Sequence, residues 1–302
     1  MAFGTRLFLA AAAFSISALG AAPGMAATLI EGDVIASGGI GGSLTEADFI
    51  QSGAASFTVG DTTIYVGTRQ VSATNQNPVV ASFTNGVQDW RREDYETGAA
   101  DGRGRGVVWD GLGQLYAAFT IDGGQSSSVG FEAFTLDGWG QNYGSGGGPS
   151  VAVLLRLDPA TGDALGGTYV ISQLSSGNTN TVVPLRLGLR DGAGAERDVF
   201  FAGDAFFLPL STDRSRMTAP PGASSPFEYR LLFDAALENA LVAEAAGLTN
   251  VQNVEGFDAL SDAFLTIIPL PASWLGLMAA LGLVVAIGRD RGKAAGCRRC
   301  GV

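Results

Sequence analysis

The sequence has 302 residues, 44 of them glycine, with 29 acidic residues against 18 Lys and Arg and no His. The absence of His excludes Ser-His-Asp and Cys-His catalysis and every metal site that needs an imidazole ligand. The only cysteines, Cys297 and Cys300, lie near the C-terminal end, so the preceding residues hold neither a disulfide nor a reactive thiol.

Residues 1–27 have the three regions of a secretory signal peptide. Arg6 supplies the single positive charge, an apolar run covers Leu7 to Leu19, and small residues follow up to Ala26 and Ala27. The apolar run is short for a membrane-spanning helix, which disfavours the alternatives of an uncleaved anchor or a buried helix. We therefore predict export through the Sec translocon and cleavage by signal peptidase after Ala26 or Ala27.

Residues 28–265 form the predicted exported body, which is strongly acidic. Six of the 18 basic residues and one of the 29 acids lie outside it, which leaves 12 basic residues, all Arg, against 28 acids and a net charge near −16. Such a charge repels nucleic acid, so no nucleic-acid partner is predicted. Because the body also has no Lys, Ser-Lys pairs and Schiff bases are excluded there.

Short apolar runs rich in Thr, Val and Phe, separated by turn residues, predict an all-β body. One kind of hairpin recurs with Asp and Gly at its turn, since these residues tolerate tight hairpin conformations. Its predicted turns are Gly60-Asp61, Asp110 to Gly113, Gly203-Asp204 and, more weakly, a hairpin within residues 253–267. A second kind follows each of the first three, with turns at Asn85-Gly86, Asp158-Pro159 and Asp234-Ala235.

The alternation of the two hairpins predicts an array of four-stranded antiparallel units, as in the blades of a β-propeller. Only three to four units fit, and the spacing is uneven because of insertions at residues 123–150 and 211–226. A β-sandwich is the alternative, since it also supplies regularly spaced strands. The stretches "GVVWDGLGQLYAAFT" and "AVLLRLDPATG" resemble bacterial β-propeller repeats of the SBBP-like kind.

Carboxylates are the remaining candidates for chemistry in the body. Glu93, Asp94, Glu96 and Asp101 lie close together near a predicted turn, where their oxygens suit Ca²⁺. Their spacing is not that of an EF-hand loop, so a solvated acidic loop is the favoured interpretation and no metal or cofactor is predicted. Two carboxylates could also hydrolyse a glycosidic bond, but no particular pair stands out among 28 acids.

Other motifs point to chemistry only weakly. The glycine-rich stretches 38–43 and 102–106 lack the Gly-Lys-Ser/Thr ending of a phosphate-binding loop, and Ser145 has no base in its motif. The first insertion carries four aromatic residues that either stack on sugars or fold inward. These residues are Phe131, Phe134, Trp139 and Tyr143.

Residues 266–302 predict a membrane segment. Ala272 to Gly288 is a stretch of 17 uncharged residues, at the short end of what spans a bilayer as a helix. Arg289, Arg291 and Lys293 follow it directly, and basic residues beside a hydrophobic helix hold that side in the cytoplasm. The body would then face outward. The Cys297 and Cys300 pair beyond it lacks the further ligands that a structural zinc site needs.

The stretch "IPLPASWLGLMAALGLVVAIGRDR" resembles the VPLPA-CTERM type of the PEP-CTERM sorting signals. Pro269, Leu270, Pro271 and Ala272 match the box, with Ile268 in place of Val, and Arg289 and Arg291 match the basic flank. The resemblance implies a Gram-negative bacterium and processing by an exosortase, which removes the tail near the box. Proline disfavours helix in the preceding residue, so the two prolines keep this segment extended for a processing enzyme.

The sequence as a whole predicts an exported cell-surface or extracellular-matrix protein that is sorted by an exosortase. We expect a structural or adhesive body that is not an enzyme, with an extracellular polysaccharide as the partner that the resemblance suggests. One alternative is a two-carboxylate enzyme acting on polysaccharide. Another is a protein that stays anchored permanently by its single membrane span.

Overall fold

The computed structural model describes residues 29–35, 38–98, 100–123, 130–191, 195–246 and 248. Several predicted features lie outside these residues: the signal peptide with Ala26 and Ala27, the hairpin within residues 253–267, and the sorting signal from residue 266 onward. No helix in the described part is long and apolar enough to cross a bilayer.

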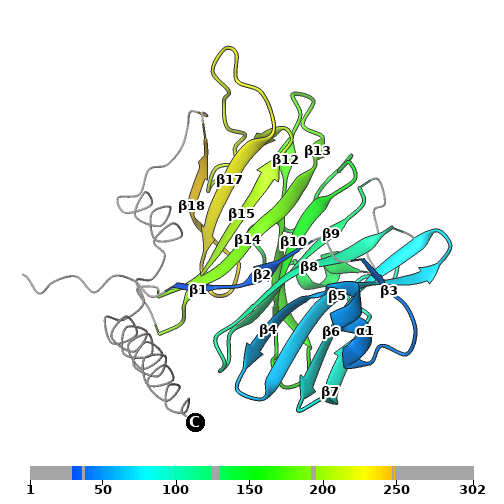
Figure 1. The fold of residues 1–302 in the computed structure, drawn as a ribbon. Helices are drawn as coiled ribbons and strands as arrows, with labels where there is room; N and C mark the ends of the chain where they lie inside the picture. The colour runs from blue at the N-terminus through cyan, green and yellow to red at the C-terminus, as the bar shows by residue number, and fades with distance from the viewer. Residues whose placement is uncertain are drawn as a thin grey trace, which may run out of the picture.

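The described chain is built mainly of three large sheets, each containing four antiparallel strands that succeed one another along the sequence, interrupted only in the third by the short strand β16 (Leu208–Pro209) (Figure 1). The first sheet contains β4 (Ala55–Val59), β5 (Thr62–Ser72), β6 (Asn75–Thr84) and β7 (Val87–Arg92). The second contains β8 (Gly102–Trp109), β9 (Leu115–Ile121), β10 (Val151–Leu157) and β11 (Ala164–Val170). The third contains β14 (Val182–Arg190), β15 (Asp198–Ala205), β17 (Phe227–Phe233) and β18 (Ala240–Ala245).

An N-terminal strap joins the three sheets, and it is formed by residues 29–35 and 38–40. Its strand β1 (Leu29–Glu31) pairs with β14 of the third sheet, and β2 (Asp33–Val34) pairs with β8 of the second. Its strand β3 (Gly39–Ile40) pairs in parallel with β5 of the first sheet. One short segment therefore adds a strand to every large sheet.

The remaining elements are short. Helix α1 (Glu46–Ser52) begins at Thr45, whose side chain and that of Asp48 cap each other's backbone N–H. Its Phe49 ring lies against Tyr65 and Phe83 of the first sheet. A single 3-10 turn, η1 (Phe131–Phe134), lies in the first insertion. A small sheet is formed by β12 (Ser172–Gln173), β13 (Thr179–Asn180) and β16 (Leu208–Pro209).

The main core lies between the large sheets. On β5, Ile64 and Val66 face this core while Tyr65 between them faces α1, as the two-residue period of a strand requires. Strand β8 packs against strands of both the first and the third sheet, so the second sheet lies between the other two (Figure 1). The core joins all three through residues such as Val66, Tyr116 and Phe201.

The all-β prediction is confirmed, and so are most of the predicted hairpins. The turns at Gly60-Asp61 and at Asn85-Gly86 connect β4 to β5 and β6 to β7. Asn85 and Gly86 both have positive φ, as the tight turn that favours Asn-Gly requires. The turns at Asp110 to Gly113, Asp158-Pro159 and Asp234-Ala235 also connect neighbouring strands of one sheet.

The predicted turn at Gly203-Asp204 is wrong. Strand β15 runs through both residues, and Gly203 lies opposite Pro184 on one side and Tyr229 on the other. Glycine is needed here for another reason, because a Cβ on Gly203 would lie 2.7 Å from the carbonyl oxygen of Val183. The described sheets do not close into a ring, so the propeller-like arrangement stays a prediction.

Candidate functional site

Residues 130–150 of the first insertion, the part beyond Gly123 that the structure describes, pack on the free edge of the second sheet. The amide of Gly140 donates to Thr168 Oγ1 (2.7 Å), and the amide of Tyr169 donates to the Gly140 carbonyl (2.8 Å). The fit is close, because a Cβ on Gly138 would overlap the carbonyl oxygen of Gly167. The insertion thus covers the edge of β11, which would otherwise expose unpaired backbone groups.

Trp139 connects this insertion to the third sheet. Its backbone amide donates to the Leu237 carbonyl (2.9 Å), and its indole Nε1 donates to the Thr212 carbonyl (2.8 Å). The indole ring also meets Phe233 edge-on, with ring centroids 5.7 Å apart. Trp139 is buried, so one side chain fixes the insertion against the β17–β18 hairpin.

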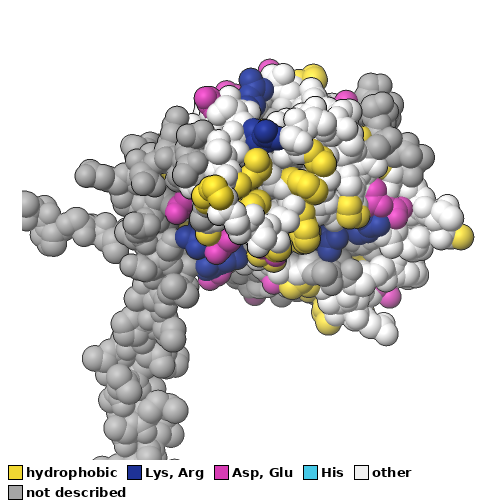
Figure 2. Space-filling model, turned by 90° about the horizontal axis from the view of Figure 1, so that it is seen from above, with side chains coloured by type: hydrophobic (Ala, Val, Ile, Leu, Met, Phe, Trp, Pro, Cys, Tyr) yellow, Lys and Arg dark blue, Asp and Glu magenta, His cyan; other side chains and the backbone are white. Residues whose placement is uncertain are grey.

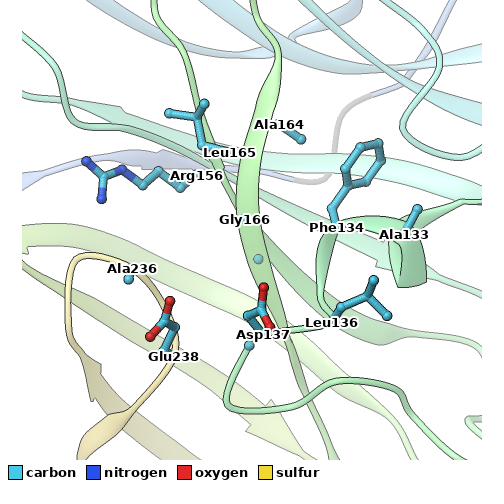
Figure 3. Close-up of a pocket in the computed structure, with 12 residues that line it drawn as sticks. Ala133, Phe134, Leu136, Asp137, Arg156, Ala164, Leu165, Gly166, Ala236 and Glu238 are labelled. Atoms are coloured by element: carbon cyan, nitrogen blue, oxygen red, sulfur yellow. The ribbon is translucent and has the colours of Figure 1, made fainter.

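A pocket of about 430 Å³ lies where the insertion, the β10–β11 hairpin and the β17–β18 turn meet (Figure 3). Phe134 and Leu136 line it from the insertion, and Leu165 lines it from β11. The backbones of Gly166 and Gly167 contribute a surface without side chains. Pockets of this size accommodate small organic ligands.

Two carboxylates border this pocket from different elements. Asp137 comes from the insertion and Glu238 from the β17–β18 turn, and both are exposed. Figure 3 shows both carboxylates on the same side of the pocket in that view, with Leu165 and Ala164 on the opposite side. No hydrogen bond or ion pair to either carboxylate is found within the described part of the chain, so both can accept bonds from a ligand.

Arg156 is the single basic residue among those that line the pocket. Its guanidinium forms an ion pair with Glu196 (2.6 Å) and donates to the Ala235 carbonyl (3.3 Å). The positive charge is therefore already matched by a carboxylate outside the pocket lining. The same Ala235 carbonyl accepts from the Tyr116 hydroxyl (2.6 Å), so Arg156 and Tyr116 together hold the β17–β18 turn in place.

The aromatic residues of the insertion divide into two groups. Phe131, Trp139 and Tyr143 are buried, so these three follow the second of the two alternatives, in which the loop folds its aromatics inward. Phe134 is only partly buried and lines the pocket. Sugar stacking by the whole set is therefore ruled out, and Phe134 alone remains beside a ligand-sized space.

The acidic residues near Glu93 do not form the solvated loop that we expected. Glu93 pairs with Arg69 and Arg91, Asp94 pairs with Arg92, and Asp101 pairs with Arg103. Arg91, Arg92 and Arg103 each stand two residues from their partner in the sequence, whereas Arg69 comes from β5. Within the described ranges, no group of three or more acidic residues could hold a metal ion.

Glu96 differs from its neighbours because it is buried, with 1% of its surface exposed. Its Oε1 accepts from the Gly98 amide (2.5 Å), while Oε2 has no hydrogen-bond partner within the described residues. Burial raises the pKa of Glu96 above its ordinary value of 4.5, and the charge of Glu132 adds to this shift. The folded protein thus holds a proton on Glu96 more tightly than the unfolded chain does.

This shift predicts a pH-dependent stability. The contribution of Glu96 is fully present below pH 4.5 and is lost as the pH rises through the higher pKa of the folded state. Because glutamine cannot ionise, the free energy of unfolding of Glu96→Gln should rise relative to the parent between pH 4.5 and 7.5. Urea denaturation at several pH values measures the difference. The same substitution at exposed Glu238 is the control, and a constant difference for Glu96→Gln at every pH would contradict the assignment.

The remaining motifs have structural positions. The glycine-rich stretch 102–106 lies within β8, and the stretch 38–43 runs from β3 toward α1. Ser145 Oγ donates to Asn178 Oδ1 (3.0 Å), with no titratable base in that contact. Comparison of the chain with protein-family models, with curated proteins and with solved structures finds no match.

Sequence reasoning did not single out Asp137, Arg156 or Glu238. Asp137 follows the aromatic run of the insertion directly before Gly138-Trp139, and Glu238 follows the predicted turn at Asp234-Ala235. Both are exposed carboxylates beside turns, which are common in so acidic a chain. Only the packing of three segments that are far apart in sequence brings them to one pocket.

Proposed function

We propose that this protein is exported, processed by an exosortase and retained on the cell surface or in the extracellular matrix, where its body has a structural or adhesive role. One observation carries the proposal: the Pro269 to Ala272 box directly precedes an uncharged stretch that ends at Arg289 and Arg291. A permanent anchor requires only the last two features, because the prolines add no membrane affinity. The box is what a processing enzyme requires.

The described body supports a binding role more than a catalytic one. The first insertion, the β10–β11 hairpin and the β17–β18 turn surround a pocket with an apolar wall and two available carboxylates. Figure 2 shows hydrophobic side chains gathered on one face, with acidic and basic side chains around them. Exposed apolar groups of this kind often mark sites of interaction. We also propose that the three described sheets are blades of a propeller-like array.

A second candidate function is favoured by one observation. Asp137 and Glu238 border the same pocket, and a pair of carboxylates is the machinery of glycoside hydrolysis. The remaining lining residues are glycines, alanines, apolar side chains and Arg156, whose guanidinium is already engaged by Glu196 and the Ala235 carbonyl and so is not available to position a scissile bond. Binding of a saccharide is therefore the preferred role for the pocket.

Replacing both Pro269 and Pro271 by alanine tests the sorting proposal. Alanine is about 3 kcal/mol more favourable than proline inside a helix, so the helix should extend toward Thr266 and the segment should cease to be extended. Hydrophobicity barely changes, so membrane insertion should persist. We expect unprocessed full-length protein to accumulate in the membrane fraction of the native host, as measured by blotting for a tag in the body.

The matched control replaces Pro220 and Pro221, two exposed prolines in the second insertion, by alanine. This variant should be processed like the parent. A host that lacks its exosortase should accumulate the same full-length form from the parent sequence. Equal amounts of full-length protein in all four cases would defeat the sorting proposal and favour a permanent single-span anchor.

A further inference from the structure

We propose that the pocket bordered by Asp137 and Glu238 binds a saccharide that carries free amino groups, such as a glucosamine polymer. This inference rests on the proposed surface or matrix role and names the chemical class of the polymer that the body would hold. Two features of the pocket carry it: the charge that the pocket leaves unmatched, and the shape and polarity of its wall.

The two carboxylates give the pocket an unmatched negative charge. Neither Asp137 nor Glu238 is engaged by another group in the described part of the chain, while the nearby guanidinium of Arg156 is taken by Glu196. The pocket therefore presents two negative charges without a matching positive charge. The body as a whole is also acidic, so its field attracts a cation and repels an anionic polysaccharide. An ammonium group donates charge-assisted hydrogen bonds to carboxylates, which are stronger than neutral ones.

The apolar wall of the pocket indicates which kind of molecule carries the ammonium group. Leu136 and Leu165 are 67% and 58% exposed, although both line the pocket, and the partly buried ring of Phe134 lies between insertion and sheet. A sugar ring has an apolar face of C–H groups that covers such side chains, and its hydroxyl groups remain available to the carboxylates and the solvent. A small metal ion or an isolated ammonium ion would leave this wall uncovered.

Glycine supplies the room for the ring. Gly166 has ordinary backbone angles, and a Cβ placed on it would meet only the Ala236 carbonyl oxygen, at 3.7 Å. A side chain at this position can therefore be accommodated by the fold, and it would fill the pocket. Gly166→Val thus offers a way to block the pocket without changing its charge, because valine is favoured in strands.

The test is calorimetric titration of the purified full chain with a β-1,4-linked glucosamine hexamer. The fully N-acetylated hexamer presents the same rings without the charge, and should bind at least about tenfold more weakly. Asp137→Asn and Glu238→Gln should each weaken binding of the glucosamine hexamer by about tenfold, which corresponds to one charge-assisted hydrogen bond. Asp61→Asn, the same charge change at an exposed hairpin turn away from the pocket, should bind like the parent.

Gly166→Val should abolish binding while its circular dichroism spectrum and its urea midpoint stay close to those of the parent. Binding should also weaken as salt is added, because exposed charges are screened. An oligogalacturonate, which is anionic, should not bind.

Several outcomes would overturn the inference. These are the absence of binding to the parent, equal affinity for the acetylated hexamer, and unchanged affinity in both carboxylate variants. Equally tight binding of a trilysine peptide would show that ammonium groups are recognised without the sugar. Shortening of the hexamer by the parent but not by Asp137→Asn or Glu238→Gln would instead establish the two-carboxylate enzyme. None of these readouts depends on processing of the tail, so failure here and failure of the sorting proposal remain distinguishable.

Discussion

Replacing Trp139 by alanine is expected to lower the free energy of unfolding by about 3–5 kcal/mol, as for other buried tryptophans. The variant loses the ring contact with Phe233 and the hydrogen bond from the indole to the Thr212 carbonyl. It leaves a cavity between the first insertion and the β17–β18 hairpin. Urea denaturation followed by circular dichroism measures the change.

Trp139→Phe is the matched control, because it keeps an aromatic ring and loses the indole N–H. It should cost about 1 kcal/mol for the lost hydrogen bond, together with a smaller packing loss. If the alanine and phenylalanine variants were equally stable, the ring would not be what joins the insertion to the third sheet. Because the pocket is bordered by both segments, Trp139→Ala should also weaken ligand binding.

Replacing Gly104 by alanine is expected to cost about 3 kcal/mol or more, at the upper end of the range for overpacked cores. Strands β5 and β8 belong to different sheets, yet their backbones meet at Gly67 and Gly104. A Cβ on Gly104 would overlap the Gly67 carbonyl oxygen and lie 2.7 Å from the Gly67 amide nitrogen. Rotation of a side chain cannot relieve a contact with backbone atoms, so the first and second sheets must separate locally. Because this separation moves β8 away from β5, the hydrogen bond from the Gly104 amide to Thr68 Oγ1 (3.2 Å) would also be lost.

Gly113→Ala provides the comparison for this effect. Gly113 lies in the β8–β9 turn, and a Cβ there meets no atom within 4 Å. Its stability should stay within about 0.5 kcal/mol of the parent, as for most surface substitutions. A similarly small change for Gly104→Ala, measured by thermal or urea unfolding, would mean that the two sheets are not in close backbone contact.

The hairpins were predictable where their signal is local. Asn85-Gly86 and Asp158-Pro159 specify turns by their own backbone preferences, independently of what packs against them. Gly203-Asp204 carries the same kind of signal, but it lies in β15, whose neighbours β14 and β17 pair with both of its sides. Pairing with two strands satisfies the backbone of Gly203 in an extended conformation. The conformation of Gly203-Asp204 is therefore decided by β14 and β17, which lie elsewhere in the sequence.

The candidate site was predictable only in part, for the same physical reason. The insertion and its aromatic residues were visible in the sequence, and Phe134 does line a pocket. The presence of Asp137 and Glu238 at the same pocket depends on Trp139, which holds the insertion against the third sheet. The burial of Glu96 likewise depends on the packing around it, and so does the ion pair that Glu93 forms with Arg69 of β5. The alternation of hairpins along the sequence does not indicate which residues from distant segments come together in the fold.

The N-terminal strap has a consequence for the order of folding. The first and second sheets consist of strands that follow one another along the chain, so they can form from contacts of short sequence separation, which form quickly. Strand β1 pairs with residues 188–190, so the strap cannot be completed until this far part of the chain has formed its strand. Between the formation of β14 and the docking of β1, the edge of β14 that β1 later covers is open to other chains, as unpaired edges are. In the export proposed above, a chain that emerges N-terminus first would expose β1 well before its partner strand β14 follows, and β1 would be open to pairing with other chains in this interval.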